Sequence, residues 1–479
     1  MNKYKYLLKN VGLLTISNFG TKILSFILIP IYTNYLTTAE YGTFDIYATT
    51  ISLLTPLLTL NIIEAVMRFS LDTNSLKKDI FSIGIKHIAI SIFILMVFVI
   101  INKVIGIFPI LNEYWILFLL LYITDVFYSI CTQFSRGLEK VKSIAISGAM
   151  NTIVLLLLNV TFLVYFKMGL KGYFLSYILS YIFPTLYLIL KNNLYNYIKV
   201  EKLDKTTSKI MKKYSIPLIF NTIGWWINNV SDRYIVTWIC GVNANGVYSI
   251  AYKIPSILNV LQSIFSQAWT LSAVKEINNK KNDFYLKIYK IYNLVFVLTC
   301  SLLILLDKPI AYILFSNEFF NAWKYAPFLM ISVVFGSLSG LLGGIFSAVK
   351  NSKIFANTTM YGAIINTILN VILVKVIGPL GASIATLCAY IVVWGIRLYY
   401  AKRIVNLNID LYKDIISYVI LIIQSIAILI IKNNIIFWIE ILLIIILIIL
   451  NVSDIKILIK NILNFIKRRK NEKITDYQK

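Results

Sequence analysis

Charged residues and histidine are scarce in this chain of 479 residues. Asp, Glu, Lys and Arg together make up 14% of it, and His87 is its one histidine. Soluble domains carry about 25% charged residues, so the composition excludes a water-soluble enzyme. One histidine cannot build a histidine-based metal site or a histidine-driven catalytic triad. We therefore expect neither a metal site nor an enzyme.

Cysteine and the common nucleotide and hydrolase motifs are also rare or missing. Cys131, Cys240, Cys300 and Cys388 lie in or beside apolar stretches, and none are spaced as CxxC. This pattern excludes a disulfide framework and a zinc ribbon. The chain has no Walker A and no GxSxG motif. We expect no cofactor, no hydrolysis and no ATP-driven transport by this chain alone.

Apolar residues, by contrast, reach 59%, and the mean hydropathy is +0.78. A helix crosses the hydrocarbon core of a bilayer with about 20 mostly apolar residues. We predict an all-α polytopic membrane protein with about 14 transmembrane helices. The predicted spans are 10–35, 42–67, 80–101, 115–135, 143–165, 172–190, 215–239, 248–271, 288–306, 326–347, 355–374, 381–401, 414–431 and 435–451.

The net charge of +25 is distributed unevenly between the loops. Alternate loops, counted from the N-terminus, hold 34 Lys and Arg in 120 residues, whereas the opposite loops hold 7 in 61. Cytoplasmic loops of membrane proteins are enriched in Lys and Arg. We predict a multi-pass protein of the plasma membrane with both termini in the cytoplasm. The charge is thus a topology signal, and no nucleic-acid partner is expected.

The two halves of the chain resemble each other. The segment 41–44 (YGTF) recurs as 245–248 (NGVY), and Asn159-Val160 recurs as Asn370-Val371. Two parallel six-helix bundles suit a transporter that alternates between two openings. We predict an N-terminal six-helix lobe at 1–200, a C-terminal six-helix lobe at 205–405, and two additional helices with a basic cytoplasmic tail at 410–479. The last two spans look free of polar residues, so we expect them to face lipid.

Several charged and polar residues fall within or at the ends of the spans. A charge at the bilayer centre costs about 3 kcal/mol on insertion scales, so each needs a partner, water or a function. We predict a hydrated lumen with cations that bind an anionic substrate. The predicted lumen cations are Lys22, Arg68, Arg233 and Lys253. The predicted polar lining or coupling residues are Asn18, Glu64, Asp125, Asn228 and Asp232.

Some of these charges also have a purely structural interpretation. A buried ion pair of Lys22 with Asp125 or Asp232 is the alternative to anion binding. Glu64 and Arg68 are four residues apart, which favours a pair between them at the cytoplasmic end of their helix.

The positions of further polar residues and of one proline within the spans predict local features. Asp125, Ser129 and Gln133 recur every four residues, which predicts a polar stripe on one helix face. Asp45 is expected near the outer end of its helix, in contact with water. Pro56 lies inside the second span, where it frees a backbone carbonyl and predicts a kink.

Segments in both halves match a known pattern. Ser231-Asp232-Arg233-Tyr234, the segment 246–253 and the segment 265–273 resemble the second-half signature of polysaccharide biosynthesis proteins. Glu40-Tyr41-Gly42 resembles the start of the first half. Asp232, Arg233 and Lys253 match signature positions. The chain is thus similar to the Wzx-type oligosaccharide flippases of the multidrug/oligosaccharidyl-lipid/polysaccharide exporter superfamily.

The resemblance implies a function. Wzx-type flippases move oligosaccharide repeat units linked to polyprenyl pyrophosphate across the membrane, for surface polysaccharide synthesis, and the resemblance implies the same activity for this chain. A polymerase and glycosyltransferases of the same pathway are implied as possible partners. The alternative is a multidrug or organic-cation antiporter of the same superfamily. Those antiporters typically carry an acid in the first helix, where this chain has Lys22.

Overall fold

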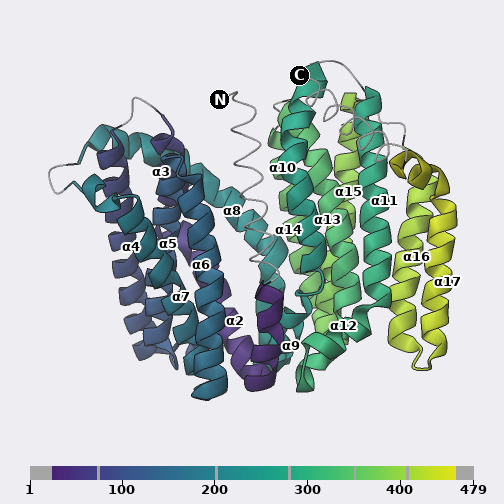
Figure 1. The fold of residues 1–479 in the computed structure, drawn as a ribbon, viewed down its shortest axis with the longest axis horizontal. Helices are drawn as coiled ribbons and strands as arrows, with labels where there is room; N and C mark the ends of the chain where they lie inside the picture. Colours follow the sequence, from purple (N-terminus) through teal and green to yellow (C-terminus); the bar gives the residue numbers. More distant parts are fainter. Residues whose placement is uncertain are drawn as a thin grey trace, which may run out of the picture. The chain divides into compact units, whose positions relative to one another are not determined.

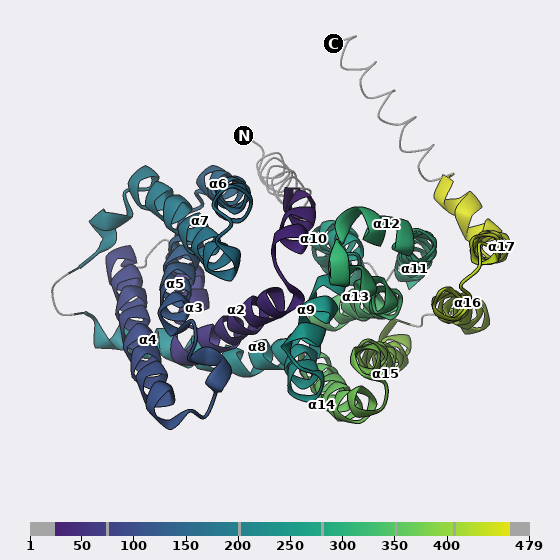
Figure 2. The same ribbon diagram turned by 90° about the horizontal axis from the view of Figure 1, so that it is seen from below.

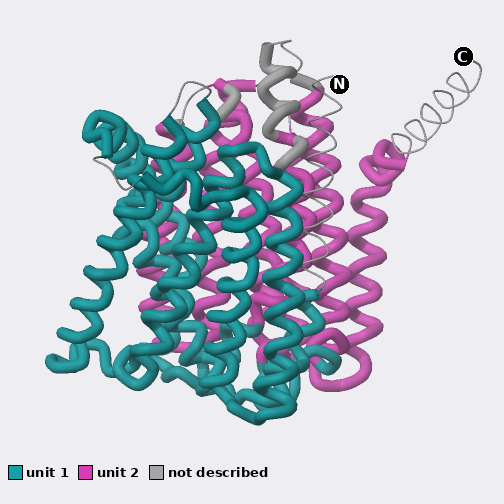
Figure 3. Tube along the Cα trace, turned by 60° about the vertical axis from the view of Figure 1, so that its left-hand side comes forward, with its two compact units in different colours: residues 1–250, 312–321 teal, residues 251–311, 322–479 magenta. Residues whose placement is uncertain are grey.

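The computed structural model describes residues 24–72, 76–199, 203–278, 282–349, 352–405 and 409–459. Helices hold most of these residues, and none of the described ranges contains a β-strand. The predicted all-α fold is therefore confirmed. Contacts divide the chain into two compact units (Figure 3). Unit 1 holds Met1–Ile250 and Tyr312–Asn321, and unit 2 holds Ala251–Ala311 and Ala322–Lys479.

The helices are labelled in Figure 1. Those that begin in unit 1 are a helix over Leu24–Tyr35, α2 (Thr38–Leu58), α3 (Ile62–Ser70), α4 (Lys77–Ile105), α5 (Trp115–Gly137), α6 (Val141–Asn159), the π-helical η2 (Val160–Tyr165), α7 (Gly169–Lys191), α8 (Lys205–Cys240), α9 (Val242–Ala251) and the short η1 (Pro109–Leu111), η3 (Leu194–Tyr197) and η4 (Asn317–Lys324). Those that begin in unit 2 are α10 (Ser256–Asn278), α11 (Asn282–Leu305), α12 (Asp307–Leu314), α13 (Ala326–Ala348), α14 (Ser352–Ile377), α15 (Pro379–Val405), α16 (Leu411–Ile430) and α17 (Ile435–Leu450).

The number of spans agrees only in part with the expected count. Among the described residues, nine helices are long and apolar enough to cross a membrane, or eleven if each of two bent pairs forms one span. The first predicted span lies largely outside the described residues, and the long helix α8 is too polar to meet the same criterion. The chain is a multi-pass helical protein, while the count of fourteen stays a prediction.

Glu40 fixes the start of two helices in unit 1. Its Oε2 accepts a hydrogen bond from the backbone N–H of Thr37 at 2.9 Å, and the Thr37 hydroxyl accepts one from the N–H of Glu40 at 3.2 Å. This capping box satisfies N–H groups that the first turn of α2 leaves free. Its Oε1 accepts from the N–H of Leu170 at 3.1 Å, in the first turn of α7. One carboxylate therefore links the starts of α2 and α7.

Asp204 begins α8 in a similar way. Its two carboxylate oxygens each accept a backbone N–H at 3.0 Å, from Thr206 and Thr207. Hydrogen bonds from the hydroxyls and N–H groups of these two threonines hold the pKa of Asp204 well below its usual range. The ionised cap lies at the positive end of the helix dipole, which favours it further.

The predicted kink in the second span is a complete break. α2 ends two residues after Pro56, and α3 starts at Ile62 at an angle of 63° to it. Leu60 and Asn61 between them have φ of 53° and 52°, which is the left-handed region. Because Leu60 is neither glycine nor asparagine, the chain stores strain at this residue.

The repeated glycines of the two halves lie against each other where α2 crosses α9. A methyl group on Gly42 would overlap the carbonyl oxygen of Val242, and one on Gly246 would overlap the carbonyl oxygen of Thr38. Only glycine allows two helix backbones to approach so closely. The internal repeat therefore brings its two matching segments into direct contact within unit 1.

In unit 2, α13 is the most buried span, with α10, α11 and α15 packed around it (Figure 2). Both α16 and α17 pack against α11. Their contact contains a chain of hydrogen bonds: the Ser301 hydroxyl donates to Gln424 at 2.8 Å, and the Gln424 amide donates to Glu440 at 2.8 Å. Glu440 is buried. The prediction that the last two helices simply face lipid is therefore wrong for one face of each, because buried polar groups there need partners inside the protein.

The glycine crossing yields a test. Gly246→Ala places a methyl group on the backbone of α2, so we expect it to destabilise the protein by about 1–3 kcal/mol. The measurement is the thermal unfolding temperature of the purified protein in detergent. Gly224→Ala in α8 is the matched control, because a methyl group there meets no atom within 4 Å. Equal unfolding temperatures for the two variants would contradict the close crossing.

Candidate functional site

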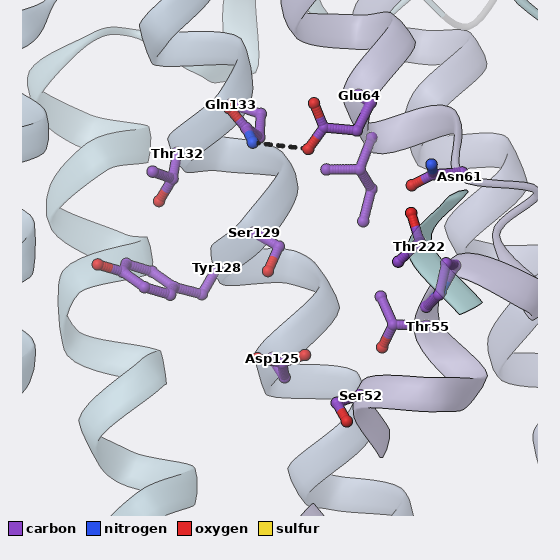
Figure 4. Close-up of a pocket in the computed structure, with 12 residues that line it drawn as sticks. Ser52, Thr55, Asn61, Glu64, Asp125, Tyr128, Ser129, Thr132, Gln133 and Thr222 are labelled. Atoms are coloured by element: carbon purple, nitrogen blue, oxygen red, sulfur yellow. Dashed lines mark hydrogen bonds between the residues drawn. The ribbon is translucent and has the colours of Figure 1, made fainter. Parts of the chain in front are cut away.

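A polar cavity of about 350 Å³ lies in unit 1 at the break between α2 and α3 (Figure 4). The break contributes residues from both of its sides, α5 forms the facing wall, and α8 adds one residue. The lining residues are Ser52, Thr55, Pro56, Asn61, Ile63, Glu64, Asp125, Tyr128, Ser129, Thr132, Gln133 and Thr222. Most of these side chains carry hydroxyl, amide or carboxyl groups, although the helices around them are apolar.

The polar stripe predicted on α5 forms one wall of this cavity. Asp125, Ser129 and Gln133 all line it, on successive turns of the helix (Figure 4). The residues that directly follow these three, Val126, Ile130 and Phe134, point about 100° further round the helix and are fully buried. The four-residue spacing thus aims the polar groups into the cavity and the apolar groups into the core.

Several polar atoms of the lining have no hydrogen-bond partner among the described residues. They are buried and belong to the hydroxyls of Thr55 and Thr132 and to the side-chain nitrogen of Asn61. Buried polar groups in proteins are nearly always paired, with protein, water or ligand. Because all three side chains line one cavity, they are available to an occupant rich in hydroxyl groups.

The described lining is acidic rather than basic. It includes Glu64 and Asp125 and no Lys or Arg. The Glu64 carboxylate accepts a hydrogen bond from Gln133 at 3.1 Å, and Gln133 in turn accepts one from Arg136 at 3.1 Å. Among the described residues, Asp125 has neither an ion pair nor a hydrogen bond.

The expected pair of Glu64 and Arg68 does not form. Arg68 instead pairs with Asp72 at 2.9 Å, one turn further along, where both side chains are about half exposed. The bend between α2 and α3 turns Glu64 toward the cavity and Gln133, so that its carboxylate points away from the exposed end of α3. Arg68, predicted as a lumen cation, therefore lies on the surface and not in the cavity.

Arg233, a further predicted lumen cation, belongs to a polar cluster that joins α2, α8 and α9. Its guanidinium donates to Asp45 at 2.6 Å, and Asn245 donates to the other oxygen of Asp45 at 3.3 Å. The neighbouring Asp232 is buried and accepts a hydrogen bond from the Tyr248 hydroxyl at 2.6 Å. Asp45 is only 8% exposed, so the expectation that water surrounds it is wrong: an arginine from a helix distant in sequence replaces the water.

The remaining predicted residues have separate places. Asn228 on α8 is buried and donates to the Gly224 carbonyl at 3.0 Å. Lys253 lies half-buried in unit 2, in the turn between α9 and α10. Asn18 and Lys22 lie outside the described residues. Within unit 1, the structure gathers Glu64 and Asp125 in one cavity, and Asp232 and Arg233 in the polar cluster.

Sequence reasoning missed Ser52, Thr55 and Thr222 in the lining. Single hydroxyl residues are common in membrane helices, where they bond to the carbonyl one turn before, as Thr222 does to Leu218 at 3.0 Å. Their presence in a span therefore carries little signal. A stronger signal was available at the break, because Pro56 is followed within five residues by Asn61, a residue type that tolerates the left-handed region.

The model of the family described as polysaccharide biosynthesis protein matches residues 7–270. This is more than half of the chain and includes every residue of the cavity and of the polar cluster. The chain belongs to the polysaccharide biosynthesis protein family.

Two membrane proteins match part of the chain in sequence. The chain is 26% identical to the uncharacterized membrane protein MJ1375 of Methanocaldococcus jannaschii over 284 residues, and 23% identical to MJ1068 of the same organism over 248 residues. The matches cover 56% and 47% of this chain, and 66% and 47% of those proteins, which is less than two thirds of their length.

Two solved structures have a similar fold. One is the lipid II flippase MurJ in an inward closed conformation, with a TM-score of 0.70 and 14% identity over 94% of this chain and 99% of that one. The other is an inward-facing multidrug resistance MATE family transporter of the MOP superfamily, with a TM-score of 0.65 and 13% identity over 80% and 94%. At these identities the likeness concerns the fold alone.

The Asp45–Arg233 pair yields a test. Arg233→Gln leaves a buried carboxylate without its cation, and breaking a buried pair from one side costs about 3–5 kcal/mol. The double variant Asp45→Asn/Arg233→Gln removes both charges, so we expect it to unfold at a higher temperature than Arg233→Gln alone. Thermal unfolding in detergent measures both effects.

Arg403→Gln is the control for this test, since its guanidinium stacks on Tyr399 at the exposed end of α15 and pairs with no acid among the described residues. We expect it to change stability by less than about 0.5 kcal/mol. The single variant Asp45→Asn completes a double-mutant cycle. If the stability lost in the double variant equals the sum of the losses in the two single variants, the two side chains do not interact.

Proposed function

We propose that this chain is a flippase that carries polyprenyl-pyrophosphate-linked oligosaccharide units across the plasma membrane by alternating access, for surface polysaccharide synthesis. The distribution of Lys and Arg between the loops supports a cytoplasmic location for both termini. Two six-helix lobes, at about 1–200 and 205–405, would rock around the substrate, with the last two helices outside them. A polymerase and glycosyltransferases of the same pathway are the proposed partners.

Family membership is the observation that carries this proposal. The family is described by polysaccharide biosynthesis, and the chain holds a transporter fold with no cluster of His, Cys, Asp or Glu suited to a metal among its described residues. The similar MurJ structure is that of a lipid II flippase. A lipid-linked sugar is therefore the substrate class that best joins the family to the fold.

The chemistry of the cavity supports a sugar as the group that it receives. Sugars present many hydroxyls that both donate and accept hydrogen bonds. The cavity offers carboxylate acceptors in Glu64 and Asp125, and unpaired polar groups in Thr55, Asn61 and Thr132. Substrate sites of membrane transporters are typically built at discontinuous helices, and α2 and α3 form such a helix here.

The pyrophosphate needs a separate partner in this proposal, because the described lining holds no cation. Lys22 is the candidate that the sequence supplies, near the middle of the first predicted span. A lysine ammonium binds phosphate as a point charge. The polyprenyl chain would stay in the bilayer while the head group crosses.

One observation favours the alternative of organic-cation antiport. Glu64 and Asp125 give the cavity an acidic lining, which would attract a cation. The two functions predict different consequences of deleting the gene. A flippase deletion strands lipid-linked oligosaccharide on the cytoplasmic leaflet, and we expect this accumulation in extracts of the deletion strain. Normal glycan intermediates combined with increased drug sensitivity would overturn the flippase proposal in favour of antiport.

A second test probes the cavity itself. Ser129→Phe fills space between α3 and α5, so we expect surface polysaccharide to fall at least tenfold while the amount of inserted protein stays the same. Thr124→Phe is the matched control on the same helix, because Thr124 does not line the cavity. Quantitative immunoblots and sugar analysis give the two readouts. Normal export by Ser129→Phe would show that this cavity lies off the substrate path.

A further inference from the structure

Three packed helices of unit 2 carry charge of one sign only. From residue 319 to residue 409 the sequence has no Asp or Glu, while it holds Lys324, Lys350, Lys353, Lys375, Arg397, Lys402 and Arg403. This stretch contains α13, α14 and α15 (Figure 1), which pack closely on one another. Their positive charge therefore has no counter-ion within these helices.

Arg397 is the most buried of those cations that the structure describes. It is 2% exposed, and the groups that hold its guanidinium among the described residues are all neutral. Nε donates to the Thr358 hydroxyl and Nη2 to the Thr359 hydroxyl, both at 2.9 Å, and Nη1 donates to the Ser339 carbonyl at 2.9 Å. The guanidinium also lies 4.3 Å from the centroid of the Phe355 ring. Such dipoles satisfy its hydrogen bonds but leave its charge uncompensated.

A cavity of about 260 Å³ lies beside this buried arginine. It is lined by Lys353, Ile354, Asn357, Thr358 and Tyr361 on α14 and by Tyr400 on α15. Thr358 belongs to both features, because its hydroxyl contacts Arg397 while the residue lines the cavity. The lining offers an ammonium, an amide and two phenols, and no carboxylate. These groups favour an anion rich in oxygen, such as a phosphate.

Lys353 stands exposed at this cavity and forms no ion pair with any described residue. Tyr361 and Tyr400, 50% and 38% exposed, stand beside it. Tyrosines are enriched where a membrane helix passes from the hydrocarbon core to the head groups. The cavity is therefore expected at the depth of the lipid head groups, on the side that the charge distribution assigns to the cytoplasm.

An exposed apolar stripe continues from the cavity along α14. Met360, Ile364, Ile368, Ile372 and Val376 recur every four residues, and each is at least half exposed. An occupant of cavity and stripe together must have a phosphate head and a long apolar tail. We propose that α14 and α15 form a binding site for an anionic phospholipid of the bilayer, with its phosphate at Lys353 and an acyl chain along this stripe.

The experiment measures binding of radiolabelled phosphatidylglycerol to the purified full chain in mixed micelles, with phosphatidylcholine for comparison. We expect tighter binding of the anionic lipid, and a loss of about fivefold in Lys353→Gln, the size expected for one basic residue near a lipid surface. Lys375→Gln is the matched control, because Lys375 is also exposed on α14 but lies at its opposite end. It should bind the lipid like the wild type.

Several results would overturn this proposal. They are equal binding of the two lipids, unchanged binding in Lys353→Gln, or the same loss in Lys375→Gln, which would indicate a diffuse charge effect. Displacement of the lipid by inorganic phosphate alone would show that the apolar stripe contributes nothing. Stronger competition by a polyprenyl pyrophosphate than by phosphatidylglycerol would assign the site to a polyprenyl lipid instead. None of these outcomes depends on whether the chain is a flippase.

Discussion

The contact between the backbones of α2 and α9 is the constraint on which unit 1 depends. Two helices with ordinary side chains pack with their axes 8–10 Å apart, whereas Gly42 and Gly246 leave no room for even a methyl group. This close approach brings α2 within reach of the side chains of α8 and α9. The hydrogen bonds of Asn245 to Asp45 and to the Gly42 carbonyl both occur at this crossing. The ion pair of Asp45 with Arg233 lies beside it.

Buried charge is handled in two different ways in the two units. In unit 1, Arg233 is neutralised by a carboxylate, so the pair as a whole adds no net charge to the membrane interior. In unit 2, the partners of Arg397 within the described part of the chain are hydroxyl, carbonyl and aromatic groups, and no carboxylate among them offsets its charge. A charge within a bilayer is retained where it faces water, a partner or a ligand. The ion pair of Arg233 holds helices of unit 1 together. The charge of Arg397 leaves a positive potential in unit 2 that can attract an anion from outside the protein.

The sequence predicted those features that depend on local patterns. Runs of apolar residues located the helices, and the four-residue spacing of Asp125, Ser129 and Gln133 placed all three correctly on one face. The repeat marked Gly42 and Gly246 as equivalent positions, although not as a contact. Residues that pair across long distances could not be found in this way: Asp45 and Arg233 are 188 residues apart, and any acid in the spans was an equal candidate for Arg233.

The sequence also failed to predict the partners of Glu64 and Glu440, for the same physical reason. Glu64 was expected to pair with Arg68 on a continuous helix, but the break between α2 and α3 gives Glu64 a partner on α5 instead. Glu440 was overlooked because a run of Ile and Leu surrounds it. Its partner Gln424 lies on α16, in a similarly apolar sequence. Hydropathy is averaged over a window of about 19 residues, so one buried polar residue in an apolar helix changes the average very little.

The break between α2 and α3 is better explained by the cavity than by packing. Left-handed backbone costs roughly 1–2 kcal/mol at Leu60, and a continuous helix would have avoided that cost. The break also leaves the Asn61 side-chain nitrogen buried without a partner among the described residues. A purely structural feature would not retain strain and an unmet hydrogen-bond donor together, because either one lowers stability. Strain of this kind persists where it serves a site. At this break, it turns Asn61 and Glu64 into the polar cavity that α5 completes.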